Sequence, residues 1–369
     1  MRRVLVIGGG ASGLMAAIAA AEQGAKVTLL EKNRQVGKKI LVTGNGRCNL
    51  TNENQDEACY RGGEPGFART VFGNFGLPDT LRFFERLGVC AKSRNGYLYP
   101  YSDQASSVAD ALRMEAERLG VKLALGNQIL EIRALNPNGA SGDLDRPEED
   151  RAGKASGDSA VSGPRFAART EGWTYEGDAC VLAAGSAAAP ATGSDGSGYA
   201  LAESLGHRLI KPLPALVQLR CRERFYERLA GLRMEAAVRV LADGKETACD
   251  RGEVQFTRNG ISGIPVFQVS RHAVRALDEG RKVEASLNLL PQIPGGSCGL
   301  SAEKEEEEAA LEAFLRARIR DGGYKQGEAF FTGLFHEKMA LCLLERAKIP
   351  KNKKAGAFYG SPPLFYLFT

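Results

Sequence analysis

The sequence lacks the residue patterns that hold metals or disulfide frameworks. Its 369 residues include three histidines and eight cysteines, and no two cysteines have the C-x-x-C spacing. Zinc sites and disulfide frameworks depend on such spacing, so the sequence predicts neither. Scattered cysteines of this kind are typical of reduced thiols, which predicts a cytoplasmic protein.

Long apolar runs and a strong charge bias are also missing. No stretch reaches the ~18 uninterrupted apolar residues that span a membrane, because glycines interrupt residues 4–21. The net charge is only +5, and no basic run is interleaved with aromatic residues. Membranes and nucleic acids are therefore not expected as partners, whereas a small-molecule substrate is. Nothing in the sequence indicates an oligomeric state.

The N-terminal stretch "VLVIGGGASGLMAAIAA" (4–20) is the strongest positive signal. Residues 3–8 read as a strand, 12–23 as a helix and 26–31, "KVTLLE", as a second strand. Two strands joined by one helix within about thirty residues predict a parallel pair with a right-handed crossover.

Three glycines at the strand-to-helix turn satisfy the pattern G-x-G-x-x-G: Gly8, Gly10 and Gly13. Gly8 allows the tight turn, Gly10 lets the backbone approach a pyrophosphate, and Gly13 lets the helix pack near the sheet. Glu31 ends the second strand, where its carboxylate can accept both ribose hydroxyls of an adenosine. This context favours a dinucleotide site over a purely structural turn, and Glu31 disfavours the 2′-phosphate of NADP there.

The stretch that follows distinguishes FAD from NAD. Residues 31–52, "EKNRQVGKKILVTGNGRCNLTN", contain neither a Val/Ile-rich strand nor a regular helix. They form a long loop with many N–H donors and the cations Lys38, Lys39 and Arg47. Such a loop suits an elongated FAD better than NAD. Residues 177–206 contain another strand followed by a polar, glycine-rich turn. In flavoproteins with two dinucleotide-binding domains, a strand that ends in this way passes close to the FAD.

The remaining segments give a coarse element order. Helices are expected over 78–88, 104–119, 199–206, 301–320 and 336–348, a strand pair over 121–134, and short strands with turns over 208–300. Residues 136–164 are rich in Gly, Ser, Pro and acidic residues, which predicts a disordered surface loop between two strands of one hairpin.

Five stretches resemble one family of flavoproteins, the BaiN-like and aminoacetone-oxidase-like NAD(P)/FAD-dependent oxidoreductases. The matching stretches are "IGGGASGLMAA", "EKNRQVGKKILVTGNGRCNLTN", "LAAGSAAAPATGSDGSGYALAESLGH", "PLPALVQL" and "GEVQFTRNGISGIPVFQVSR". The resemblance implies an α/β fold, with a Rossmann-like FAD-binding domain over 1–195 and an inserted β-rich substrate domain with helices over 196–335.

The end of the chain departs from this family. Members return to the FAD domain with a late segment that contains a strand, a Gly-Glu pair, an Asp and further glycines, and a last helix. Residues 336–369 show no such segment and end in the apolar "PLFYLFT". The expectation is therefore a truncated or frame-shifted member with an incomplete C-terminal return, so that flavin retention is in question.

The resemblance also implies cofactor-binding residues, which fall into four groups. On the ADP half of FAD it places Gly8, Gly10, Ala11, Ser12, Gly13, Glu31 and Lys32; along the middle and flavin end Lys39, Thr43, Gly44, Asn45, Gly46 and Arg47; against the adenine Ile129; and near the pyrophosphate Ala184 and Gly185.

The activity implied is that of an FAD-dependent oxidoreductase. NADH or NADPH would drive hydride transfer through the flavin to a small unsaturated or carbonyl substrate. The alternatives are an O2-using amine oxidase, a non-catalytic dinucleotide-binding protein and a flavin-dependent RNA modifier. No catalytic residue is predicted, because the flavin itself carries the hydride chemistry. Cys48 lacks a partner at the spacing of disulfide reductases, so loop packing is its expected role.

Overall fold

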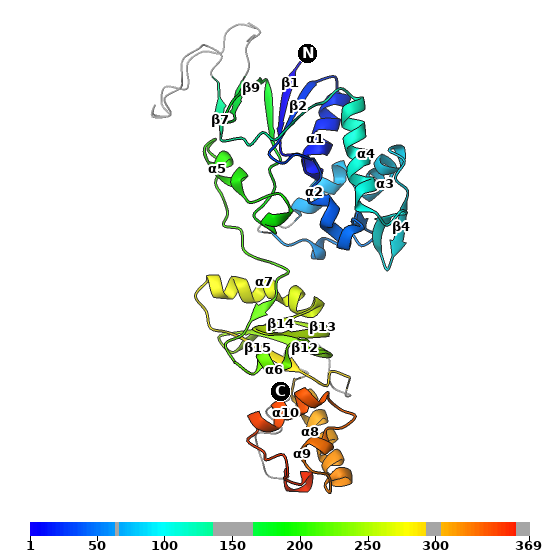
Figure 1. Ribbon diagram of the computed structural model, residues 1–369, viewed down its shortest axis with the longest axis vertical. Coiled ribbons are helices and arrows are strands. Elements are labelled where there is room, and N and C mark those ends of the chain that lie inside the picture. The colour runs from blue at the N-terminus through cyan, green and yellow to red at the C-terminus, as the bar shows by residue number, and fades with distance from the viewer. Residues whose placement is uncertain (63–65, 136–164, 293–303, 359–369) are drawn as a thin grey trace. The chain divides into compact units, whose positions relative to one another are not determined.

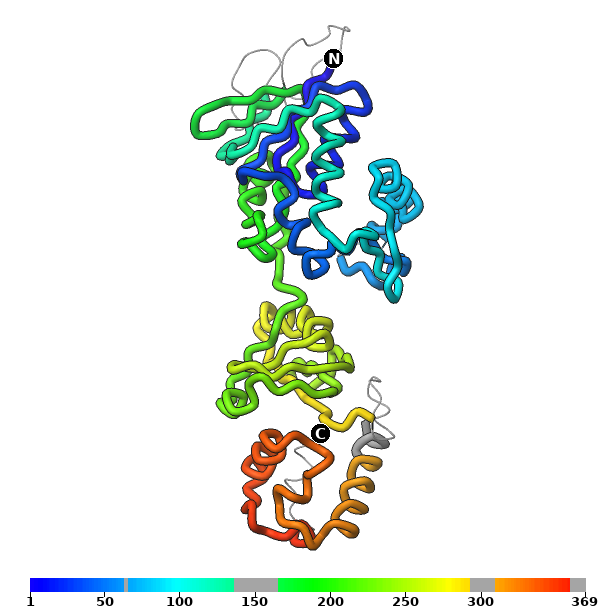
Figure 2. Tube along the Cα trace, turned by 45° about the vertical axis from the view of Figure 1, so that its right-hand side comes forward, coloured from blue at the N-terminus to red at the C-terminus, as the bar shows by residue number. Residues whose placement is uncertain are grey.

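The computed structural model describes residues 1–62, 66–135, 165–292 and 304–358, and the chain divides into two compact units (Figures 1 and 2). The first unit is Met1–Ile210 and the second is Lys211–Thr369. The three-part division at 195 and 335 stays a prediction. The predicted loop over 136–164 and the apolar end of the chain lie outside the described residues.

A parallel four-stranded sheet forms the centre of the first unit. Its order is β10-β1-β2-β6, with β1 at Arg3–Ile7, β2 at Lys26–Glu31, β6 at Lys122–Leu125 and β10 at Ala179–Leu182. Side chains alternate between its faces, so Val6 and Leu29 join one core cluster while Leu5 and Leu30 join another. Both faces are therefore buried, as parallel sheets require.

Different elements cover the two faces. The helices α1 (Ala11–Glu22) and α4 (Ala105–Arg118) pack on the Val6 face. The other face is covered by a three-stranded antiparallel sheet and by α5 (Figure 1); these are β7 (Glu131–Ala134), β8 (Phe166–Arg169), β9 (Thr174–Gly177) and α5 (Ser197–Glu203). The predicted Rossmann-like α/β fold is confirmed.

Two predictions about strand pairing have different outcomes. Strands β6 and β7 both lie within 121–134, but they do not pair with each other: β6 continues the parallel sheet beside β2, and β7 pairs with β8. The sequence shows strands but not their partners, and the turn at Gly126 redirects the chain between sheets. The hairpin across the 136–164 loop is confirmed, because β7 and β8 are antiparallel.

Short elements form the side of the first unit that carries the 31–52 loop. They are η1 (Ile40–Gly46), β3 (Thr51–Asn52), η2 (Glu57–Cys59), α2 (Phe67–Asn74), α3 (Leu77–Arg86), β4 (Ala91–Arg94), β5 (Tyr97–Pro100) and, after β10, η4 (Pro190–Thr192). Gly44 and Asn45 inside η1 adopt left-handed backbone, and the chain kinks there between two short turns.

The second unit contains a five-stranded sheet in the order β11-β14-β13-β12-β15. Its strands are β11 (Leu219–Arg220), β12 (Arg233–Ala242), β13 (Lys245–Thr257), β14 (Gly260–Ser262) and β15 (Val283–Asn288). Its helices are α6 (Tyr226–Leu229), α7 (Ile264–Asp278), α8 (Lys304–Gly322), α9 (Gly327–Phe330) and α10 (Glu337–Arg346), followed by η5 (Ala355–Phe358).

The prediction of short strands and turns over 208–300 is wrong in two respects. Strands β12 and β13 form a long antiparallel hairpin, and α7 is a helix of 15 residues. Gly263 precedes this helix and Pro265 occupies its first turn, where proline is favoured.

One cysteine departs from the reduced-thiol prediction. Six described cysteines are free, but Cys249 on β13 is disulfide-bonded. The cysteine spacing in the sequence gives no signal for this bond. The predicted cytoplasmic location stays a prediction.

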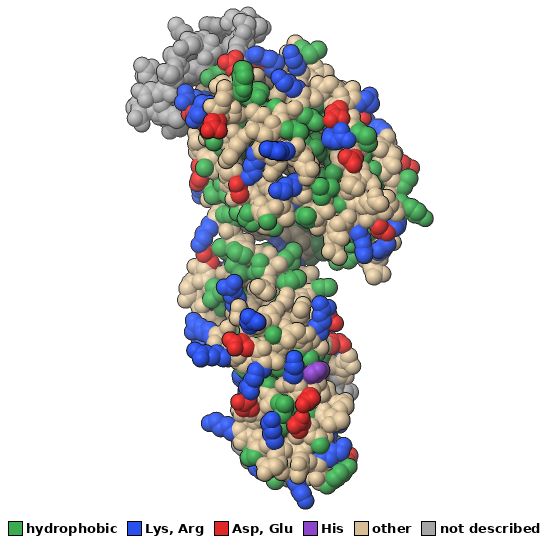
Figure 3. Space-filling view, in the orientation of Figure 1, with side chains coloured by type: hydrophobic (Ala, Val, Ile, Leu, Met, Phe, Trp, Pro, Cys, Tyr) green, Lys and Arg blue, Asp and Glu red, His purple; other side chains and the backbone are tan. Residues whose placement is uncertain are grey.

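Three surface features of the described residues bear on the predicted partners. Within the described residues, no helix is both long and apolar enough to cross a membrane. On the face shown in Figure 3, basic and acidic side chains are interspersed. No group of three or more His, Cys, Asp and Glu side chains in the described part is arranged to hold a metal.

Candidate dinucleotide site

The glycine turn between β1 and α1 is held by close backbone packing. Gly8 has φ +106°, and a Cβ there would lie 2.3 Å from the Ala183 carbonyl oxygen. A Cβ on Gly13 would lie 1.8 Å from the Gly8 carbonyl oxygen. The protein's own backbone therefore explains two of the three glycines of the motif.

Gly10 differs from the other two because no protein atom lies within 4 Å of the position of a Cβ on it. Its φ of −77° and ψ of −173° are extended backbone that any residue adopts. Nothing in the protein's packing thus requires glycine there. The open space is the feature expected where a pyrophosphate approaches the backbone.

The N-terminus of α1 begins at this open space. Gly10 is its N-cap, no side chain caps the helix, and its first turn holds no acidic residue. The first N–H groups of a helix have no partner within it, and they carry the positive end of the helix dipole. Such an end can bind phosphate oxygens through Ala11 and Ser12, which line the adjoining cavity.

Glu31 is buried beside the turn, with 7% of its surface exposed. Its Oε2 accepts a hydrogen bond from the Gly9 N–H at 2.6 Å. Its Oε1 accepts bonds from the Asn33 N–H at 2.7 Å and from Asn33 Nδ2 at 2.5 Å. A carboxylate has about four acceptor positions, so these three bonds leave about one for a ribose hydroxyl.

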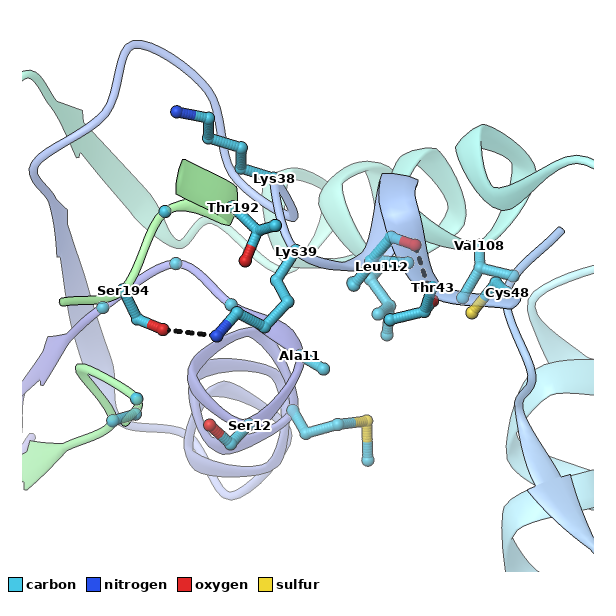
Figure 4. Close-up of a pocket in the computed structure, with 18 of the residues that line it drawn as sticks. Ala11, Ser12, Lys38, Lys39, Thr43, Cys48, Val108, Leu112, Thr192 and Ser194 are labelled. Atoms are coloured by element: carbon cyan, nitrogen blue, oxygen red, sulfur yellow. Dashed lines mark hydrogen bonds between the residues drawn. The ribbon is translucent and has the colours of Figure 1, made fainter. Parts of the chain in front are cut away.

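A cavity of about 750 Å³ runs from the turn along α1 (Figure 4). Its polar part is made by the glycine turn, Glu31, the 33–43 loop and the 183–194 segment. Its other part is apolar; the side chains there are Met15, Ile40, Leu50, Phe75, Phe83, Phe84, Val108 and Leu112. A phosphate-binding end joined to an apolar end suits a molecule with an ADP half and a flat ring system.

A small cavity of about 40 Å³ adjoins the other side of the Glu31 strand. It is lined by Gly8, Glu31, Lys32 and the segment Asn127–Ile129. Glu31 lines both cavities, and Ile129 lines the smaller one.

Lysines from the loop bind the 183–195 segment. Lys39 Nζ donates hydrogen bonds to Ala188 O and to Ser194 Oγ, both at 2.7 Å. The neighbouring Lys38 side chain points away from Ser194 (Figure 4). Lys32 Nζ lies 2.8 Å from Asp195 Oδ2, and this bond holds the pKa of the Asp195 carboxyl well below its usual range. The two glycine-rich stretches found in the sequence thus meet at one site.

The predicted cofactor residues fall into two sets. Those that line one or both of these cavities are Gly8, Gly10, Ala11, Ser12, Glu31, Lys32, Lys39, Thr43, Ile129, Ala184 and Gly185. Those that line neither are Gly13, which packs under the turn, and Gly44, Asn45, Gly46 and Arg47. Their roles toward FAD stay predictions.

The sequence prediction missed the apolar wall. Phe83 comes from α3, and Val108 and Leu112 come from α4. Apolar residues in an amphipathic helix look alike whether they face a core or a cavity, so no local signal marks these residues as part of a site. Gly193 and Ser194 also line the cavity. They lie within the second glycine-rich stretch, and that composition was the available signal that they belong to the site.

Cys48 lies at the apolar end, buried and with φ +60°. Burial raises the pKa of its thiol, while a hydrogen bond with Thr43 lowers it by less. Since the thiolate is the reactive form, we expect iodoacetamide at pH 8 to label Cys48 at least ~10-fold more slowly than exposed Cys59 or Cys90. Labelling followed by mass spectrometry measures this, and FAD should slow Cys48 further without changing Cys90. Equal rates at Cys48 and Cys90 would contradict the buried placement.

The two-sided parallel sheet, the glycine turn, the uncapped helix and Glu31 together define a dinucleotide-binding protein of Rossmann type. Residues 2–323 match the HI0933-like protein Rossmann domain, so the chain belongs to the HI0933-like family.

Relatives with a stated activity agree with this class. The chain is 41% identical over 354 residues to the 3-dehydro-bile acid delta(4,6)-reductase of Clostridium scindens, covering 95% of this chain and 77% of the reductase. It is 27% identical over 290 residues to the ribosomal RNA dihydrouridine synthase of Escherichia coli, covering 78% of this chain and 64% of the synthase. The chain thus spans less than two thirds of the synthase. The predicted family and the predicted class of FAD-dependent oxidoreductase are confirmed.

Distant matches are found among solved structures. The 3-ketosteroid-Δ4-(5α)-dehydrogenase of Rhodococcus jostii RHA1 is 14% identical, with a TM-score of 0.38, over 67% of this chain and 61% of the dehydrogenase.

Proposed function

We propose that this chain binds FAD along the cavity and uses NADH or NADPH to reduce a small unsaturated or carbonyl compound. The observation that carries the proposal is the open space at Gly10, in front of the uncapped α1 N-terminus. Identity of 41% to a reductase of a 3-dehydro-bile acid supports an unsaturated ketone as the substrate class.

The cavities contain residues suited to each chemical group of FAD. The first N–H groups of α1 would hold the pyrophosphate, Glu31 a ribose hydroxyl, and the backbone near Ile129 the adenine. When bound, FAD supplies hydride transfer. The apolar side chains around Phe83 and Leu112 would exclude water from the ring system.

The experiment is reconstitution of the purified full chain with FAD, followed by anaerobic addition of NADH or NADPH. We expect a stoichiometric yellow complex that loses its flavin absorbance with one of the two donors. A 3-oxo-4,6-diene bile acid should then restore the absorbance without oxygen. A folded protein that binds no FAD would overturn the proposal as a whole.

The alternatives give other outcomes in the same experiment. An O2-using amine oxidase would be bleached by an amine and not by NADH or NADPH. A non-catalytic binding protein would hold FAD that neither donor reduces. The relatives that are named ribosomal RNA dihydrouridine synthases motivate one further arm, in which RNA replaces the bile acid as the oxidant. If RNA alone reoxidised the flavin, the proposed substrate would be a nucleic acid and not a small molecule.

A further inference from the structure

A second cavity, of about 590 Å³, lies within the second unit. All the residues that line it belong to Lys211–Thr369, whereas the dinucleotide cavity is lined only by the first unit. Its volume lies in the range of roughly 300–1,000 Å³ typical of small-molecule pockets. It is therefore large enough to be a binding site of its own.

One face of the sheet forms the floor of this cavity. Arg239 on β12 pairs with Ser286 on β15, and Leu241 pairs with Glu284 and with Glu246. Directly paired residues on neighbouring strands share a face, so these five side chains point to the same side. All five line the cavity.

The opposite face of the sheet is occupied by α7. Ala236 pairs with Gly252, and a Cβ on Gly252 would meet Pro265 of α7 at 3.5 Å. Val238 and Val240 point to the same side as Ala236 and are fully buried. The face toward α7 is thus apolar, while the face toward the cavity carries charged side chains.

Helices α6 and α10 supply apolar walls. Tyr226 and Leu229 come from α6, and Met339 and Leu343 come from α10. The rings of Tyr226 and Phe256 are stacked, with centroids 6.2 Å apart and planes at 26°. Buried aliphatic and aromatic surfaces of this kind favour a flat ring compound.

The polar feature of the cavity is a buried ion pair. Arg239 Nε lies 3.4 Å from Glu246 Oε2, with side chains 8% and 15% exposed. Glu246 Oε1 has no hydrogen-bond partner among the described residues. Rotation about the last side-chain torsion of glutamate, which is a soft one, can bring this oxygen to the cavity. Both residues line the cavity, so the pair presents a carboxylate and a guanidinium to it side by side.

The charges around the cavity select the polar group of the ligand. Three glutamates and two arginines line it; they are Glu223, Glu246, Glu284, Arg239 and Arg346. This excess of carboxylates disfavours a carboxylate ligand. An ammonium would compete with Arg239 for Glu246, and would leave the buried guanidinium without its carboxylate. A neutral group with a donor beside an acceptor avoids both costs.

We propose that this cavity is a second small-molecule site, and that its ligand is a neutral ring compound with a carboxamide group. The amide N–H₂ donates to Glu246, and the amide oxygen accepts from Arg239. The ring packs between Tyr226 and Leu343. This site is independent of the dinucleotide cavity and of the proposed reaction.

The test uses benzamide as the probe, titrated into the full chain and followed by NMR of methyl groups. We expect saturable shifts of the methyl signals of Leu229, Met339 and Leu343. Benzoate, which lacks the amide, and acetamide, which lacks the ring, should each bind at least ~10-fold more weakly than benzamide. No saturable shift, or shifts confined to the first unit, would overturn the proposal.

A double variant separates recognition by the ion pair from simple partitioning into an apolar space. Arg239→Met/Glu246→Leu removes both charges together, which avoids an unpaired buried charge. We expect benzamide to bind at least ~10-fold more weakly and toluene to bind as well as before or better. Unchanged benzamide affinity would overturn the role of the pair.

A second variant covers the case in which the double variant does not fold. Ser286 lines the cavity from the edge strand β15 and shares a face with Arg239, so Ser286→Trp adds bulk on the cavity side of the sheet. We expect loss of benzamide binding with FAD binding unchanged. Retained benzamide affinity would place the probe elsewhere and overturn the proposal.

Discussion

Gly10→Val is expected to abolish FAD binding while leaving the protein folded. The backbone at Gly10 is extended, and a Cβ there has no protein atom within 4 Å. We therefore expect the free protein to lose less than about 1 kcal/mol, the cost of a poor N-cap residue. The added methyl groups fill the space proposed for the pyrophosphate, so FAD affinity should fall by ~100-fold or more, about 2.7 kcal/mol.

Two measurements on the same sample test this expectation. Flavin fluorescence titration gives the affinity, and thermal unfolding without FAD gives the stability. Gly10→Ala should show a smaller loss of affinity in the same direction. Normal FAD affinity in Gly10→Val would show that the open space is not the phosphate site. A large loss of stability without FAD would show that the glycine serves the fold.

Gly13→Ala should have the opposite effect, because it acts on the fold. Its Cβ would lie 1.8 Å from the Gly8 carbonyl oxygen, a distance that forces β1 and α1 apart. Overpacking of this severity is expected to destabilise the first unit by about 3 kcal/mol or more. Hydrogen exchange followed by mass spectrometry, compared between peptides of the two units, measures where protection is lost.

Gly73 provides the matched control for this substitution. It lies in α2 and a Cβ on it would meet no atom within 4 Å. Alanine is favoured over glycine in a helix by roughly 0.8–1.0 kcal/mol, so Gly73→Ala should be neutral or stabilising. If the Gly13→Ala protein showed the same hydrogen-exchange protection as the Gly73→Ala protein, the close packing of Gly13 against Gly8 would be disproved.

The turn and its strands could be predicted from sequence because their signals are local. Residues 26–31 are β2 as predicted, and the glycine spacing located the turn. Helix α7 was missed because Val266 and Val269 are β-branched and stand among short strand-like stretches. Their spacing with Ala273 and Ala276, together with Pro265 after a glycine, was the helical signal that was available.

The candidate site was predictable only where its chemistry is polar. Glu31, Gly8 and Gly10 have distinctive residue types at fixed spacing, and all three line the cavity. The apolar wall depends on how α3 and α4 pack against α1, and no residue type encodes that arrangement. The same limit applies to Cys249, whose disulfide no nearby cysteine spacing predicts.

The hydrogen bond between Glu31 and the Gly9 N–H also limits how cofactor preference could change. In Rossmann-type sites for nicotinamide dinucleotides, replacement of the acidic residue by a smaller or basic one favours the 2′-phosphate of NADP over NAD. Here the same carboxylate also holds the backbone of the glycine turn and fixes Asn33. Its replacement would therefore loosen the turn proposed to hold the pyrophosphate while it altered the proposed ribose site. An engineered change of nucleotide preference requires at least two substitutions, one of which must supply a new acceptor for Gly9.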